Sequence, residues 1–374
     1  HRTGGPPPLL PPLLRREPAL CAAAAAALLS MLAVPPSAAY LGYVDLRVLC
    51  LLFCLMAVVA GLQSCQLFSL MAQRLLAGRH NPRFVMTLLV LLPFFTSMLV
   101  TNDVSLITFV PFAILVLRII GRSEYLIPVI VLQTVAANLG SMATPVGNPQ
   151  NLFLYASYEL SAGSFFGVTV PLTLLSLLGL LAACLFFPGG VIRVDFSQRC
   201  AITDRRRLGM YLLLFLLCLL TVFRVLPYGI LTAVVALLLL AVDRPVLREV
   251  DYCLLLTFVC FFIFAGNIGA IAPVKSFLEA LLDRSAVLSS ILASQVISNV
   301  PAAVLLAGFT DDWQGLLVGT NLGGLGTLIA SLASLISFKR YAALPEARPG
   351  RYLAVFTAVN LAGLLLLVPL SYLL

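Results

Sequence analysis

The sequence predicts an all-α polytopic membrane protein with inverted-topology repeats, two re-entrant hairpins and broken transmembrane helices. Three observations predict this fold. Hydrophobic residues make up 61% of the 374 residues and charged residues only 10%, whereas a soluble domain carries roughly 25% charge. Apolar runs long enough to cross a bilayer recur along the whole chain. Polar segments interrupt these runs at corresponding places in the two halves.

The two longest polar interruptions resemble each other. Residues 138–152 align with residues 321–335 without a gap. The identical pairs are Asn138 and Asn321, Leu139 and Leu322, Gly140 and Gly323, Thr144 and Thr327, and Leu152 and Leu335. A shorter polar break precedes each copy, at residues 101–103 and at residues 298–299. By itself, the small-residue stretch 321–334 would also fit close helix packing, but its partner at 138–152 favours a site.

The first repeat is predicted over residues 19–187, after an N-terminal tail at 1–18 that is rich in proline and expected to be disordered. Its apolar runs cover residues 19–36, 46–62, 84–121, 125–158 and 163–187. The run 84–121 is broken by Thr101, Asn102 and Asp103. We interpret it as a re-entrant hairpin with the polar break at its tip, since irregular backbone at that depth has to be buried in protein or line a wet cavity.

An Arg-rich cytoplasmic loop and one linker helix are predicted over residues 188–225, and the second repeat over 226–374. The apolar runs of the second repeat cover residues 226–242, 252–271, 286–309, 313–338 and 352–374. The run 286–309, broken at Ser298 and Asn299, is too short for two crossings at 1.5 Å rise per residue, so it is predicted as the second hairpin. The single linker crossing would invert the second repeat relative to the first.

The basic residues predict the orientation. With the N-terminus in the cytoplasm, all but four of the 23 Lys and Arg residues fall on the inner side, as the positive-inside rule requires. The four on the outer side are Arg47, Arg224, Lys275 and Arg284. This places a multi-pass protein in the plasma (inner) membrane with its C-terminus external. The net charge of +8 then reflects orientation in the lipid bilayer, and we expect no nucleic-acid partner.

Segments 63–80 and 272–285 precede the two hairpins and alternate polar and apolar residues at helical spacing. They are predicted as amphipathic helices lying at the membrane interface, with ordinary loops as the alternative. Nine cysteines are present, without a CxxC spacing or a Cys/His cluster. We interpret them as apolar packing residues rather than metal or redox groups.

Asp103 is the acidic residue that this topology places near the membrane midplane. A carboxylate at that depth is costly and marks a functional site, although Asp and Asn after a break can also cap the next helix. The two roles are compatible. A buried carboxylate without a basic neighbour either takes up a proton or ligates a cation, so we expect Asp103 to carry the cation dependence of the protein.

The polar breaks offer two kinds of group. Side-chain oxygens and unwound carbonyls suit a hard cation such as sodium, and helix N-termini suit an anion. Helices are expected to begin after Asn102, Asn151, Asn299 and Ser331. The candidate substrate and ion site comprises Thr101, Asn102, Asp103, Asn138, Gly140, Thr144, Gly147, Asn148, Asn151, Ser298, Asn299, Asn321, Gly323, Thr327 and Ser331. Sodium is expected near Asn102, Asp103 and Asn299. No enzyme motif is present, so we predict no catalytic residue and no cofactor beyond a coupling Na⁺ or H⁺.

These motifs resemble the ion-transporter superfamily, which includes arsenite permeases, NhaD-type sodium–proton antiporters and citrate or dicarboxylate transporters. The resemblance runs from about residue 19 to near the end. It implies inverted repeats, two hairpins, a homodimer and elevator-type movement. In the dicarboxylate branch both hairpin tips carry Ser-Asn-Thr. Here they carry Thr101-Asn102-Asp103 and Ser298-Asn299-Val300, which is more similar to the arsenite-permease and antiporter branch.

The sequence therefore predicts a secondary active transporter for an anionic or oxyanion-like solute, of carboxylate or arsenite type, coupled to a proton or sodium gradient. A sodium–proton antiporter that uses the same midplane site is the main alternative. A membrane enzyme or a structural subunit without transport activity would show a second polar cluster away from the midplane, and the sequence shows none.

Overall fold

A computed structural model describes residues 18–196, 200–202 and 204–373. All of the predicted tail except Pro18 lies outside these residues. The described chain is an all-α polytopic membrane protein. Its one sheet pairs two three-residue strands, β1 (Gly78–His80) and β2 (Ile192–Val194), in antiparallel register.

Helices occupy the predicted apolar runs. In the first half they are α2 (Pro18–Ala33), α3 (Ala39–Tyr43), α4 (Leu46–Ser64), α5 (Leu67–Leu76), α6 (Pro82–Thr96), α7 (Asn102–Ile119), η1 (Ser123–Tyr125), α8 (Leu126–Ser141), α9 (Pro149–Ser157) and α10 (Ala162–Cys184). The linker is α11 (Arg205–Val222). The second half contains α12 (Tyr228–Val242), η2 (Arg244–Arg248), α13 (Tyr252–Gly269), α14 (Ala272–Arg284), α15 (Ala286–Ile297), α16 (Asn299–Leu306), η3 (Ala307–Phe309), α17 (Trp313–Leu322), α18 (Leu332–Ala342) and α19 (Pro349–Ser371).

Helical structure stops at each of the four polar breaks. The two short breaks separate α6 from α7 and α15 from α16, and the two long breaks separate α8 from α9 and α17 from α18. One expected start is wrong: the helix predicted to begin after Asn151 begins at Pro149, because Asn148 is its N-cap and accepts a hydrogen bond from the Asn151 N–H. Proline at the first helical position needs no N–H partner there.

Five described helices, α4, α7, α10, α13 and α19, are long and apolar enough to cross a membrane. A sixth span results if α14 and α15, which are bent by 118° relative to each other, count as one. Outside the two hairpins, the sequence predicts nine crossings: four in the first repeat, the linker, and four in the second repeat. Several of these are interrupted or shorter helices, which this length criterion does not count. Segments 63–80 and 272–285 contain the helices α5 and α14 rather than loops.

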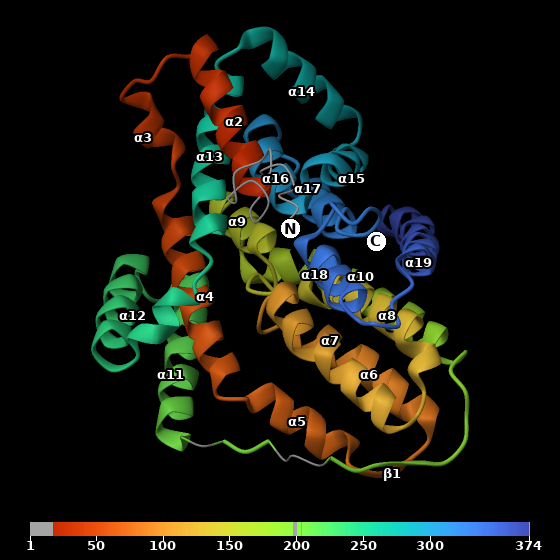
Figure 1. Cartoon of the computed structure of the whole chain (residues 1–374). Coiled ribbons are helices and arrows are strands. Elements are labelled where there is room, and N and C mark those ends of the chain that lie inside the picture. The colour runs from red at the N-terminus through yellow and green to blue at the C-terminus, as the bar shows by residue number, and fades with distance from the viewer. Residues whose placement is uncertain (1–17, 197–199, 203, 374) are drawn as a thin grey trace, which may run out of the picture.

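Helix packing in one half has a counterpart in the other. α6 packs on α8 and α15 on α17; α7 packs on α18 and α16 on α9; α2 packs on α13 and α12 on α4. These pairs follow one correspondence between the halves, in which α2, α4, α6, α7, α8 and α9 match α12, α13, α15, α16, α17 and α18 in that order. When each helix is replaced by its match, the first contact of every pair becomes the second. A two-fold relation produces such reciprocal contacts. In Figure 1, α5 and α14 accordingly lie at opposite ends of the molecule.

Gln133 fixes α6 and α7, which form the predicted first hairpin, to α8. Pro93 lies inside α6 and lacks the N–H that would bind the carbonyl of Leu89. The fully buried Gln133 side chain fills this place, because its Nε2 donates to the Leu89 oxygen at 2.7 Å and to the Phe109 oxygen at 3.3 Å. One amide thus binds both helices of the hairpin.

The aligned glycines Gly140 on α8 and Gly323 at the end of α17 allow α6 and α15, respectively, to pack closely against these helices. A Cβ atom at Gly140 would lie 2.0 Å from the carbonyl oxygen of Phe94 on α6, and one at Gly323 would lie 2.6 Å from the Ser294 Oγ on α15. Real Cβ atoms essentially never lie within 3.0 Å of such atoms. Glycine is therefore required at both positions for α6 to pack on α8 and for α15 to pack on α17.

We expect Gly140→Ala to lower stability by about 1–3 kcal/mol or more, because the new methyl group would push α6 away from α8. Gly167→Ala on α10 is the matched control, since a Cβ at Gly167 meets nothing within 4 Å. Thermal unfolding of both variants in detergent measures the difference. Equal melting temperatures would show that the contact yields without cost.

Candidate functional site

Buried side-chain hydrogen bonds join the long breaks to each other, and two of these bonds are equivalent. Asn148 Nδ2 donates to Asn321 Oδ1 at 3.0 Å, and Ser331 Oγ donates to Asn138 Oδ1 at 3.1 Å. The alignment of 138–152 with 321–335 pairs Asn138 with Asn321 and Asn148 with Ser331. The two bonds are therefore the same contact with the halves exchanged, as expected across a two-fold axis.

Further amides extend this contact into a buried polar cluster. Asn102 Nδ2 donates to Asn138 Oδ1 at 2.9 Å, Asn138 Nδ2 to the Gly324 oxygen at 3.3 Å, and Asn321 Nδ2 to Asn151 Oδ1 at 2.6 Å. The four asparagines are each at most 5% exposed. A buried amide is costly unless it is paired, so these bonds hold both loops in one arrangement.

Each hairpin tip binds the long break of its own half in the same way. The Asn102 N–H donates to the Gly147 oxygen at 3.2 Å, and the Asn299 N–H to the Ala330 oxygen at 2.9 Å. Gly147 and Ala330 occupy the same position in the alignment. The hydroxyls of Thr144 and Thr327 likewise donate to the carbonyls of Met98 and Gln295, each of which stands four residues before the tip asparagine.

The two hairpin tips approach each other around Gly324. A Cβ atom at Gly324 would lie 3.0 Å from Asn299 Nδ2 and 3.8 Å from Asn138 Cγ. Asn138 in turn binds Asn102. Both tips therefore belong to one cluster of polar groups, formed by residues from both halves.

Gln295 is a residue of this cluster that the sequence interpretation missed. Its Nε2 donates to the oxygens of Gly323 and Leu325, each at 3.0 Å, and its Oε1 accepts from the Thr327 N–H at 2.9 Å. Asn151 has the equivalent role in the first half, where its Nδ2 donates to the oxygens of Met142 and Thr144. A glutamine inside the apolar run 286–309 was the available signal.

A cavity of about 650 Å³ lies between the first hairpin tip and α4. Thr101, Asp103 and Asn148 contribute polar groups from the breaks, and Arg207, Glu249 and Asp251 contribute polar groups from helix ends. Apolar residues of α4, such as Leu55 and Val59, form much of the wall. Three of the predicted site residues thus line this cavity, and most of the others form the cluster behind it.

The charged groups of this cavity are mainly acidic. Arg207 pairs with Asp243, at 2.7 Å between Nη2 and Oδ2, and Asp243 also accepts from the Tyr211 hydroxyl. The positive charge of Arg207 is thereby offset by a carboxylate outside the cavity lining. Asp103, Glu249 and Asp251 remain as lining carboxylates.

The remaining predicted site residues lie around the cluster. Gly140, Gly147 and Gly323 sit at close approaches, where a Cβ atom would meet another atom at 2.0 to 2.6 Å. Ser298 is the tip of the second hairpin, with a left-handed φ of 73°, and its hydroxyl binds the Ala330 oxygen. Thr327 is set apart, because it is exposed and its hydroxyl is directed to Gln295.

Comparison with known proteins identifies the family. The family described as "Citrate transporter" matches residues 13–313, most of the chain. The chain belongs to the citrate transporter family. This confirms the resemblance to the ion-transporter superfamily and makes the protein a multi-pass membrane transporter. The family description and the name of one relative are those of transporters.

Two relatives match about three quarters of the chain. An uncharacterized transporter of Methanocaldococcus jannaschii is 34% identical over 282 residues, which are 75% of this chain and 77% of the relative. The inner membrane protein YbiR of Escherichia coli is 30% identical over 293 residues, 76% of this chain and 77% of the relative. A silicon efflux transporter of Oryza sativa subsp. japonica is 35% identical over 124 residues, 33% of this chain and 25% of the relative.

We expect Gln295→Ala to lower the transport rate at least tenfold, because the loop 323–327 loses three hydrogen bonds and site groups have to be held to within a fraction of an ångström. Gln295→Glu keeps the acceptor for Thr327 but loses both donors, so it should not restore the rate. Gln314→Ala, on the exposed side of α17, is the control. Initial rates across a range of solute concentrations, together with expression level, distinguish a positioning role from loss of folding.

Proposed function

We propose that this protein is a secondary active transporter that moves a small anionic or oxyanion-like solute with a proton or sodium gradient. The observation that carries the proposal is the environment of Asp103. This residue stands in the first turn of α7 and lines the cavity, and its buried Oδ1 atom has no hydrogen-bond partner within the described residues. A carboxylate oxygen placed in this way calls for a proton or a cation.

Helix N-termini supply the complementary attraction for a solute. Thr101, which precedes α7, Pro149, which opens α9, and Leu332, which opens α18, all line the cavity. N-terminal N–H groups and the helix dipole favour negative charge. An anionic solute and a cation on Asp103 would therefore support each other's binding within one cavity, which is the basis of coupled transport.

A sodium ion at this position would need oxygens from several residue types. No group of three or more His, Cys, Asp or Glu residues that could hold a metal ion occurs within the described ranges. Asp103 would then be the one charged ligand, supplemented by amide oxygens and loop carbonyls, which suit sodium. Proton uptake by Asp103 would need none of these additional ligands.

The acidic lining favours one class of solute over another. A tricarboxylate would meet Asp103, Glu249 and Asp251 in one cavity, with Arg207 already paired to Asp243. A weak oxyacid of arsenite or silicic-acid type, carried uncharged or with a cation, would avoid this repulsion. We therefore propose the oxyacid class ahead of the carboxylate class, consistent with the first tip, Thr101-Asn102-Asp103.

The decisive experiment is uptake into liposomes that contain the purified protein, with sodium and proton gradients imposed separately. Arsenite, silicic acid and citrate are tested in parallel. We expect gradient-driven accumulation of an oxyacid. Exchange of sodium for protons without any solute would instead support the antiporter, the alternative that a lone carboxylate at the tip also permits. Absence of any gradient-dependent flux would contradict both.

The movement is proposed to be of elevator type in a homodimer. The hairpins with α8–α10 and their counterparts α17–α19 would form the mobile body, and α2 and α12 the static scaffold, because the irregular backbone must stay inside protein as it moves. In the orientation predicted from the basic residues, Arg207 and Glu249 lie on the cytoplasmic side, so this cavity would face inward. Cross-linking a scaffold helix to a hairpin should stop transport; continued transport would contradict the division.

A further inference from the structure

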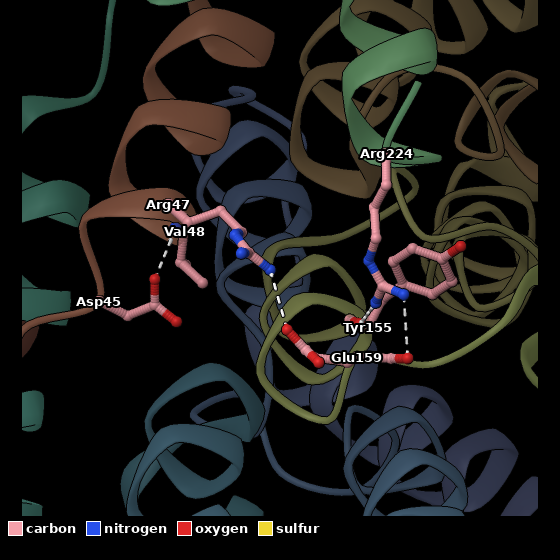
Figure 2. A network of polar contacts seen from close by, with 6 residues as sticks. All are labelled: Asp45, Arg47, Val48, Tyr155, Glu159 and Arg224. Carbon is pink, nitrogen blue, oxygen red and sulfur yellow. Dashed lines mark hydrogen bonds and ion pairs between the residues drawn. The ribbon is translucent and has the colours of Figure 1, made fainter. Parts of the chain in front are cut away.

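The end of α9 that points away from the cavity is held by two arginines. Arg47 Nη1, from the first turn of α4, lies 3.5 Å from Glu159 Oε1. Arg224 lies between α11 and α12. It donates from Nη1 to the backbone carbonyl oxygen of Glu159 at 3.0 Å and from Nη2 to the backbone carbonyl oxygen of Tyr155 at 3.2 Å. Figure 2 shows both guanidinium groups converging on this turn. We call Arg47, Tyr155, Glu159 and Arg224 the α9 clamp.

The backbone of the clamp adopts an unusual conformation. Glu159 has a φ of 50° and Arg224 a φ of 63°, a left-handed region that residues other than glycine rarely adopt. Only two other non-glycine residues in the described part of the chain, Gln66 and Ser298, share it. Each of the two stands just after the C-cap of a helix, where a left-handed residue closes the last turn: the Leu160 N–H donates to the Tyr155 backbone oxygen at 3.1 Å and the Val225 N–H to the Leu220 backbone oxygen at 2.8 Å. The clamp therefore joins the C-terminal caps of α9 and α11.

Aromatic packing supports the polar contacts. The Arg224 guanidinium carbon lies 5.4 Å from the centre of the Tyr155 ring, within the range of a cation–π contact. The neighbouring Phe223 ring packs at 6.2 Å from Tyr155 and at 6.4 Å from Phe166 on α10. The segment that follows α11 is thus attached to α9 and α10 by both charge and apolar surface.

The clamp lies within about two helical turns of the cavity lining on the same helices, before Leu52 on α4 and after Leu152 on α9. α4 lines the cavity from Leu52 to Ser64, whereas Arg47 is in its first turn. The helix rise places Arg47 about 24 Å from Gln63, which also lines the cavity. α9 likewise begins at the cavity with Pro149 and ends in the clamp.

We propose that the α9 clamp stabilises the conformation in which the cavity is open on the side of Arg207 and Glu249. The clamp contacts break when the cavity becomes accessible from the other side of the membrane. This inference rests on the proposed transport function, in which the body containing α9 and α10 moves relative to the scaffold helix α12. Helices α4 and α11 pack on α12 and on each other, so we assign them to the static side. For that movement, Arg47 and Arg224 have to release the end of α9.

The two arginines contribute unequally. The Arg47–Glu159 pair is mostly exposed, with side-chain exposures of 41% and 71%, and such pairs contribute little. Arg224 binds two backbone oxygens near the end of α9 and contacts a ring. We therefore expect loss of Arg224 to shift the conformational equilibrium strongly, and loss of the Glu159 carboxylate to shift it weakly.

The test measures from which side of the membrane a reagent can enter the cavity, and it needs no identified solute. Ile107, which lines the cavity, is replaced by cysteine in a background without the nine native cysteines. A membrane-impermeant maleimide is then applied from either side of oriented vesicles. With Arg224→Gln we expect labelling from the Arg207 side to slow at least threefold and labelling from the other side to rise. Glu159→Gln should change either rate less than twofold.

Arg284→Gln, which removes the same charge at the exposed end of α14, is the matched control and should leave both rates unchanged.

Unchanged rates in a monodisperse Arg224→Gln protein would overturn the proposal. If that variant fails to fold, a flexible thiol cross-linker between Arg47→Cys and Glu159→Cys replaces it. The cross-link should keep Ile107→Cys reactive from the Arg207 side alone; equal reactivity from both sides would contradict the clamp. The labelling result stands even if no solute is transported, so the two proposals can fail separately.

Discussion

Asp103→Asn is expected to abolish gradient-driven accumulation of solute while exchange across the membrane survives in part. The substitution keeps the size of the side chain and most of its hydrogen-bonding capacity, but removes the group that binds a proton or cation. Arg118 is the next basic residue along the first hairpin. It does not neutralise the Asp103 carboxylate, because it pairs with Glu346. Accumulation and exchange are measured in liposomes as functions of pH and sodium concentration.

Asp312→Asn provides the control for this prediction. Asp312 caps α17 by accepting a hydrogen bond from the Gly315 N–H at 2.8 Å, and it is not a lining residue of the cavity. It should keep wild-type accumulation. If Asp103→Asn also accumulates solute with the wild-type pH and sodium dependence, the carboxylate is a helix cap and coupling takes place elsewhere.

Asn102→Ala is expected to reduce transport by at least a hundredfold, with membrane expression maintained. The Asn102 amide donates to Asn138, and its oxygen accepts from the Asp103 N–H at 3.0 Å. Its loss unpairs groups beside the carboxylate and releases the tip from the cluster that joins both halves. Asn299→Ala, at the second tip, should have a similar effect.

The control is Asn81→Ala, which removes an asparagine N-cap from α6 at an exposed position away from the cavity. A cap of this kind contributes about 1 kcal/mol to stability, so expression should fall slightly and the transport rate should remain near wild type. Uptake rates normalised to the amount of protein in the membrane separate the two effects. Full activity of Asn102→Ala and Asn299→Ala would show that the short breaks are only structural.

Most of the helical architecture was predictable because its signals are local. Apolar runs indicate membrane helices, and stretches rich in asparagine, glycine, serine and threonine inside them indicate where each helix stops. Single prolines do not, since Pro93 and Pro111 lie inside α6 and α7. The gapless match of 138–152 with 321–335 also predicted equivalent positions, and the structure places hydrogen bonds at several of them. The start of α9 was predicted too late because the Asn148 cap was overlooked.

The candidate site was predictable as a set of residues but not as an arrangement. Polar residues in apolar runs pointed to Asn102, Asp103, Asn138 and Asn148, yet the same signal at Gln295 and Gln133 was not used. Whether an amide faces a solute or binds a backbone carbonyl depends on its neighbours in space. The sequence could not separate Asp103, which lines the cavity, from Thr327, which is exposed on another surface.

The sequence by itself determined the class of protein, the helices, the position of the breaks and the family, because hydropathy and helix-breaking residues act over short stretches of chain. Only the tertiary structure decided that Asn148 meets Asn321, that Asp103 keeps a carboxylate oxygen without a partner, and that Arg47 and Arg224 converge on the end of α9. These contacts join residues far apart in the chain. Their partners are decided by how the helices pack, because most buried polar groups are paired where packing places them, and Asp103 Oδ1 is an exception.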